Sequence, residues 1–212
     1  MIGSPTEGPS DSSTSREQGP LLSPFTRTLT GPPGRWLLPL VAFAGLVLLY
    51  GVSAPGGYFM QTMFGGFLGL VLVIVWAPRF VVALCRADGR PGLRRHWARW
   101  AAAPLMGVAV IGLVHFDVPY TARFALSETS LERYARAVAA GTEPETREKT
   151  VGLFSLASIE RTGTGARFRV RGTGFLSSYG FAWSPEGEPS GDYEGKYEHL
   201  RGHWYEWMEG SW

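Results

Sequence analysis

The sequence predicts a mixed fold: three transmembrane α-helices, followed by a small α+β domain in which one helix packs on an antiparallel sheet. Two observations support this prediction. Three long uncharged apolar runs lie within residues 35–117, although apolar residues form only 45% of the whole chain. Residues 118–212 instead combine alternating apolar positions, a helical repeat and turn residues, which are typical of a folded domain outside the membrane.

The first 34 residues have the composition of a disordered tail. Glycine, proline, serine and threonine fill 22 of these 34 positions, and the apolar residues show no periodicity. Such a segment buries too little apolar surface to offset the loss of chain entropy on folding. We therefore predict that residues 1–34 form a disordered tail.

Three apolar runs, at 36–54, 58–78 and 100–116, are candidates for membrane spans. The first has nineteen residues. At about 1.5 Å per residue it spans roughly 28 Å, close to the ~30 Å hydrocarbon core of a bilayer. A cleaved signal peptide is the alternative, because residues 52–54 resemble a cleavage site. The long segment before this run and Pro55 directly after it favour a membrane span instead.

The distribution of arginine predicts the topology. Six arginines and a single acidic residue lie between Arg79 and Arg99, whereas the connection at 55–57 is uncharged. The positive-inside rule therefore predicts a multi-pass plasma-membrane protein with a cytoplasmic N-terminus and an extracytoplasmic C-terminus. We expect the Arg79–Arg99 segment to contact anionic lipid headgroups of the bilayer. Nucleic acid is not an expected partner, because a short loop held at the bilayer is poorly placed to contact a duplex.

The central parts of all three runs contain no ionisable residue. Ionisable residues inside a membrane mark ion pathways and transport sites. Gln61 and His115 lie only near the outer ends of the second and third runs. The runs therefore argue against a transporter, and a small-solute transport component is kept only as the second alternative function.

Residues 118–212 predict one helix and four or five strands. The alternation in 120–126 is typical of a strand. A capping box from Thr129 to Glu132 then begins a helix, and Gly141 ends it. Further strands are expected on both sides of a turn at 163–164, at 174–184 and at 203–207.

The turn at 163–164 also predicts the register of its hairpin. It places Glu160 opposite Arg167, so that opposite charges face each other. Apolar residues then face apolar residues as well: Ile159 with Phe168, and Ala157 with Val170. A shift of one residue would place Glu160 against Phe168, which disfavours it.

Three segments of the chain resemble a group of uncharacterised three-span membrane proteins of actinomycete bacteria. These segments read RFALSE…L, GTGFLSSYGFAWSPEGEP and YEHLRGHWYEW. The composition agrees with such a source, because the chain has many arginines, few lysines and no asparagine. The resemblance covers most of residues 118–212. It implies a multi-pass membrane protein with a C-terminal extracytoplasmic domain, and it carries neither an assigned activity nor catalytic residues.

His199 and His203 have the spacing at which a helix presents two metal-binding imidazoles. Glu198 and Glu206 lie nearby as possible further ligands. However, Gly202 and the alternating aromatic residues after it favour a strand, and the general-base glutamate of a zinc-protease helix is missing. The two histidines are therefore weak metal candidates, and we expect no metal, no cofactor and no catalytic residue.

Two groups of residues are candidates for binding a ligand. Arg167, Arg169 and Arg171 share one face of a strand, where they suit an anionic ligand, although a solvated face is the common alternative. The aromatic residues near the C-terminus exceed what a small core requires, so some are expected in an exposed recognition patch. The candidates there are Trp204, Tyr205 and Trp207.

The function predicted from these patterns is that of an integral membrane protein which anchors an extracytoplasmic binding or sensing module without catalysis. Its expected partners are the lipid bilayer and an unknown protein or envelope component. The first alternative is a cell-envelope enzyme that uses His199 and His203.

Overall fold

In a computed structural model of the chain, the structure describes residues 36–85, 97–145, 148–189 and 196–210. The predicted tail at 1–34 and most of the Arg79–Arg99 segment lie outside these residues.

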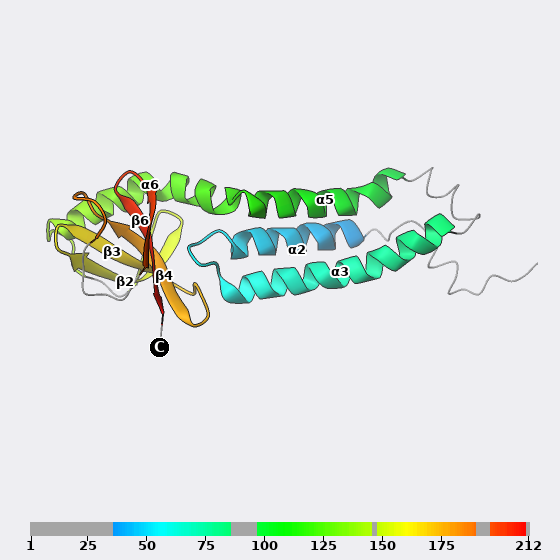
Figure 1. Ribbon diagram of the computed structural model, residues 1–212, viewed down its shortest axis with the longest axis horizontal. Helices are drawn as coiled ribbons and strands as arrows, with labels where there is room; N and C mark the ends of the chain where they lie inside the picture. The colour runs from blue at the N-terminus through cyan, green and yellow to red at the C-terminus, as the bar shows by residue number, and fades with distance from the viewer. Residues whose placement is uncertain (1–35, 86–96, 146–147, 190–195, 211–212) are drawn as a thin grey trace, which may run out of the picture.

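The described helices form a long layer that ends at the sheet (Figure 1). Helix α2 contacts both α3 and α5, and the three run side by side along the molecule. Helix α6 follows α5 after a bend of 55° and lies on the sheet. The bounds are Leu37–Gly51 for α2, Phe59–Cys85 for α3, Trp97–His115 for α5 and Val118–Ala139 for α6.

The prediction of three transmembrane helices followed by a one-helix domain is wrong. Only α3 is by itself long and apolar enough to cross a membrane, over the 24 residues Phe59–Val82. Helix α2 has 15 residues, which at ~1.5 Å each span about 22 Å and fall short of the ~30 Å hydrocarbon core. Helix α5 qualifies only together with α6, as one broken span. The described residues therefore contain one candidate span, or two if that bent pair counts as one.

Glycines allow α2 to lie close to its two neighbours. A Cβ atom on Gly65 of α3 would come within 2.7 Å of the Leu48 backbone nitrogen. A Cβ atom on Gly45 of α2 would come within 2.8 Å of Val110 on α5. Small residues at such positions let helix backbones approach each other closely.

The strand predicted at 120–126 and the helix predicted after it form one continuous helix, α6. Asp117, with a φ of 50°, separates α6 from α5. The buried residues of α6 recur at helical spacing from Phe124 to Val138, and this face packs on the sheet. Leu126, which completes the apparent alternation, is 76% exposed. The short alternating pattern thus coincided with the first turns of a longer helical repeat.

The sheet has six antiparallel strands in the order β1-β2-β3-β4-β6-β5. The prediction of four or five strands missed the two edges, because β1 is very short and β5 alternates mostly charged and polar residues. The bounds are Lys149–Val151, Phe154–Thr162, Gly165–Val170, Ser177–Trp183, Lys196–Arg201 and Trp204–Gly210 for β1 to β6.

The predicted register of the β2–β3 hairpin is confirmed near its turn and wrong farther away. The confirmed pairs are Glu160 with Arg167 and Ile159 with Phe168. Val170 lies opposite Leu156 instead of Ala157. The reason is an irregularity between Leu156 and Ser158, which places an additional residue in β2 and shifts the pairing.

An aromatic core lies between α6 and one face of the sheet. The rings of Phe154 and Phe181 meet edge to face with centroids 4.9 Å apart, a favoured geometry for aromatic pairs. The core residues that are at most 2% exposed include Phe124, Leu131, Phe154, Phe168, Phe181 and Trp204.

Candidate functional site

A cleft lies where the helical layer meets the sheet. Its volume is about 480 Å³, within the range of small-molecule sites. The turn between α2 and α3 forms one wall, and the start of α6 and strands β5 and β6 form the others. The lining residues with chemically distinctive side chains are Phe59, Asp117, Tyr120, Glu198, His199 and Glu206.

Carboxylates dominate the charge of this cleft. Glu198 and Glu206 are directly opposed on β5 and β6, and Asp117 enters from the α5–α6 junction. No lysine or arginine from the described residues lines the cleft. Three carboxylates without a nearby cation in the lining create a negative potential, which attracts positively charged ligands.

Glu206 is the most constrained of the three carboxylates. Its Oε2 atom accepts a hydrogen bond of 2.8 Å from the Tyr120 hydroxyl, and the Gly56 backbone also donates to the carboxylate. Burial nevertheless raises the pKa of Glu206 above its ordinary value of 4.5, while the Tyr120 hydrogen bond opposes the increase. Three separate elements, α6, β6 and the α2–α3 turn, therefore meet at one carboxylate.

Arg123 of α6 holds the α2–α3 turn against the sheet domain. Its guanidinium donates at 2.8 Å to the buried Ser53 hydroxyl and also donates to the Leu153 carbonyl. The same group lies near three aromatic rings, at 4.7 to 5.4 Å from their centroids, where cation–π attraction is favourable. These rings belong to Tyr50, Tyr58 and Phe154.

The backbone of the turn is fixed as well. Gly56 and Gly57 have φ values of 64° and 67°, which favour glycine. A Cβ atom on Gly56 would overlap the Tyr179 ring of β4. The Gly57 carbonyl accepts a hydrogen bond of 2.9 Å from the Gly174 amide. The wall of the cleft is thus part of the folded domain and not a free linker.

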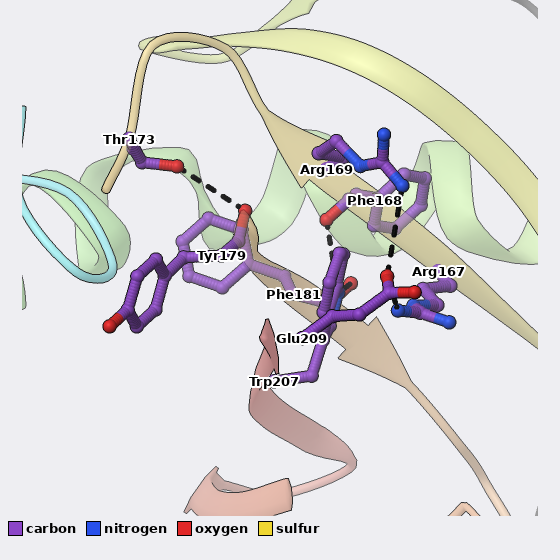
Figure 2. Close-up of polar contacts among 8 residues, drawn as sticks. All are labelled: Arg167, Phe168, Arg169, Thr173, Tyr179, Phe181, Trp207 and Glu209. Carbon is purple, nitrogen blue, oxygen red and sulfur yellow. Dashed lines mark hydrogen bonds and ion pairs between the residues drawn. The ribbon is translucent and has the colours of Figure 1, made fainter. Parts of the chain in front are cut away.

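The arginines predicted as an anion site are engaged with acidic side chains. Arg167 is only 5% exposed, donates to Glu209 at 2.9 Å and lies 3.8 Å above the Trp207 ring (Figure 2). Arg169 lies 3.8 Å from the same carboxylate. Arg171 pairs with Glu148 at 3.1 Å. The three guanidiniums are therefore paired with carboxylates and do not converge on one open site.

Both tryptophans that were predicted to form part of an exposed recognition patch are buried. Trp204 lies in the core and Trp207 on the opposite face, and they are 2% and 1% exposed. The Trp207 indole donates to the carbonyls of Phe168 and Phe181, each at 3.2 Å (Figure 2). Tyr205 is half-buried, with its ring against the His199 imidazole. The tryptophans are unavailable to a partner because they complete the packing of the small sheet.

The two histidines considered as metal ligands have different neighbours. His199 lies on β5, with its Nε2 atom 3.1 Å from the Gly202 carbonyl oxygen. His203 lies in the β5–β6 turn, with its ring against Trp183. Among the described residues, no three His, Cys, Asp or Glu side chains are grouped closely enough to hold a metal ion. Of the sequence candidates, only His199, Glu198 and Glu206 line the cleft.

Sequence reasoning missed Asp117, Tyr120 and the wall of the cleft at Gly56. Tyr120 lies 86 positions before Glu206, and no local pattern indicates that they meet. One signal was present, because Asp117 is the single acidic residue between the third apolar run and Tyr120.

Comparisons with protein-family models, curated proteins and solved structures gave no match for this chain. The resemblance to actinomycete membrane proteins therefore stays a prediction, and the geometry of the cleft is the basis for a functional proposal.

Proposed function

We propose that this protein is a membrane-anchored binding module that takes up a small organic cation in the cleft between its helical layer and its sheet. The observation that carries this proposal is the position of the cleft. Its walls come from the turn between α2 and α3, from the start of α6 and from the two last strands of the sheet. A bound ligand would contact both parts of the molecule and so report its presence to the helical layer.

The exposed surface of α3 supports the membrane anchor. Only 6% of its most apolar window is buried, so this helix is not the core helix of a globular domain. An apolar surface of this extent is stable in lipid but not in water. Large exposed apolar side chains on α3 include Met60, Phe64, Phe67, Leu70, Val73 and Ile74.

The arginines support an orientation of the anchor. The sheet lies at the end of the layer where α3 begins, and Cys85 lies at the opposite end (Figure 1). The sequence from Arg79 to Arg99 is strongly basic, and basic segments favour the cytoplasmic side. The start of α2 lies at this same end. In our proposal the Cys85 end of the layer is therefore cytoplasmic, and the sheet domain at the other end is extracytoplasmic.

The chemistry of the cleft supports a cationic ligand larger than a metal ion. Its carboxylates favour positive charge, but they are not grouped closely enough for metal coordination. Phe59 and Tyr120 add apolar and aromatic surface, which suits the alkyl part of an amine. A polyamine satisfies both requirements, because it joins ammonium groups through short alkyl chains.

Binding of spermidine to the full-length protein in nanodiscs of zwitterionic lipid tests the proposal. We expect saturable binding by calorimetry and a higher melting temperature, because a ligand that binds only the folded state stabilises it. Glu198→Gln and Asp117→Asn should each weaken binding about tenfold, which corresponds to ~1.4 kcal/mol.

Glu186→Gln is the matched control, since it removes one carboxylate from an exposed loop outside the cleft. This variant should bind spermidine like the wild type. Equal binding by all variants, or binding no greater than that of empty nanodiscs, would contradict the proposed ligand site.

A further inference from the structure

We infer that the loop before β4 is a lipid-binding element, in which Phe175 and Leu176 enter the interfacial region of the same bilayer that holds α3. The inference rests on the membrane anchor of the proposed function. It adds a second contact of the sheet domain with the membrane, beyond the helices.

The position of Phe175 relative to α3 carries the inference. Its ring stacks on that of Phe59, the first residue of α3, with centroids 4.6 Å apart. Figure 1 also places the loop before β4 beside the first turn of this helix. If α3 enters the bilayer at its first turn, Phe175 lies at the same depth. The interfacial region of a membrane is where aromatic side chains are enriched.

The exposure of this loop has no explanation within the folded domain. Phe175 is 71% exposed and Leu176 is 69% exposed, next to a sheet whose phenylalanine and tryptophan rings are buried. The first turns of α3 continue the apolar surface, since Met60 and Phe64 are also exposed. This apolar surface continues that of α3, so the bilayer around α3 is what covers it.

The loop is held in place, so its apolar tip is presented by a defined structure. Gly172 and Gly174 have φ values of 75° and 70°, which a residue with a side chain rarely adopts. The Gly174 amide donates to the Gly57 carbonyl in the α2–α3 turn. The Thr173 hydroxyl donates to the Val170 carbonyl at 3.0 Å and lies 3.4 Å from the Tyr179 carbonyl (Figure 2).

Spin-label accessibility tests the inference on the full chain in liposomes. In a Cys85→Ser background, nitroxides are attached separately to Leu176→Cys, Met60→Cys and Glu186→Cys. Position 60 reports the first turn of α3, and position 186 reports an exposed loop of the domain. We then compare two collision rates of each nitroxide. One is the rate with oxygen, which is enriched in lipid, and the other is the rate with a polar nickel complex.

We expect a severalfold higher ratio of oxygen to nickel collisions at 176 than at 186, close to the ratio at 60. An aqueous value at 176 together with a lipid value at 60 would overturn the inference and leave the membrane anchor intact. Aqueous values at both positions would overturn the anchor and, with it, the inference. Phe175→Cys provides a second reading of the loop if Leu176→Cys lowers the melting temperature.

Discussion

At the scale of single residues, Glu206 joins separate parts of the fold and also lines the cleft that we propose as a binding site. It connects β6 to Tyr120 of α6 and to the Gly56 backbone of the turn. Its burial disfavours the charged form, so the folded state binds a proton more tightly than the unfolded chain. The charge that attracts a cation in our proposal therefore costs the protein some stability when no ligand is bound.

The pH dependence of Glu206→Gln follows from this shift. Below pH 4.5 both folded and unfolded chains carry protonated Glu206, so the variant and the wild type should have similar melting temperatures. As the pH rises through the higher folded pKa, ionisation penalises only the folded wild type. Glu206→Gln should therefore become progressively more stable than the wild type toward pH 7. The measurement is the difference in melting temperature across pH, in detergent or nanodiscs.

Glu186→Gln serves as the control for this series, because its side chain lies on an exposed loop. The difference between control and wild type should change much less with pH. A Glu206→Gln variant that loses stability relative to the wild type at pH 7 would show that the ionised carboxylate is a net stabilising group.

At the scale of elements, β4 determines how the outer face of the sheet packs. Gly180 and Ala182 lie between Arg167 of β3 and Trp207 of β6. Their small size lets the guanidinium lie over the indole ring, 3.8 Å from its centre. The Trp207 indole then donates to one backbone carbonyl of β3 and one of β4. The three central strands are thus tied together by one side chain on this face.

Gly180→Ala should loosen this arrangement. The added methyl group would lie 2.9 Å from a ring atom of Trp207 and would overlap the Phe168 carbonyl. Overpacking of this kind costs about 1–3 kcal/mol of unfolding free energy, and more where backbone must move. Gly66→Ala is the matched control, because a Cβ atom there meets nothing within 4 Å. A lower melting temperature is expected for Gly180→Ala alone, and equal values for both variants would contradict this packing.

At the scale of the whole molecule, the helical layer and the sheet domain are joined at more than one place. The chain passes from α5 to α6 through the bend at Asp117. The α2–α3 turn is held independently by Arg123 and by the hydrogen bond between Gly174 and Gly57. A ligand in the cleft between these connections would therefore act on the helices through fixed contacts and not through a flexible linker.

The orientation of the protein is tested by labelling with a membrane-impermeant maleimide in intact cells. Cys85 is exposed at the end of α3 far from the sheet. It should react only after the cells are permeabilised, because the basic end is cytoplasmic in our proposal. Cys85→Ser with Glu186→Cys should react in intact cells. The reverse pattern would contradict the proposed orientation, and labelling of both sites in intact cells would contradict a membrane crossing by α3.

The sequence by itself determined the features that depend on neighbouring residues. The apolar runs predicted the helices of the layer, and the turn at 163–164 predicted the hairpin with Glu160 opposite Arg167. Both follow from local periodicity and turn chemistry. The count of spans failed for the same reason. Composition shows that a run is apolar, but it does not show where a helix ends or bends, as at Gly51 and Asp117.

Only the tertiary structure decided which side chains meet. Glu160 is the cross-strand neighbour of Arg167, yet Arg167 donates to Glu209 on a strand two positions across the sheet. Tyr120 reaches Glu206 across 86 residues, and their contact forms part of the cleft. The physical reason is that a side chain responds to whatever the fold places within a few ångströms. That arrangement depends on the strand order and the helix bend, which no local pattern contains.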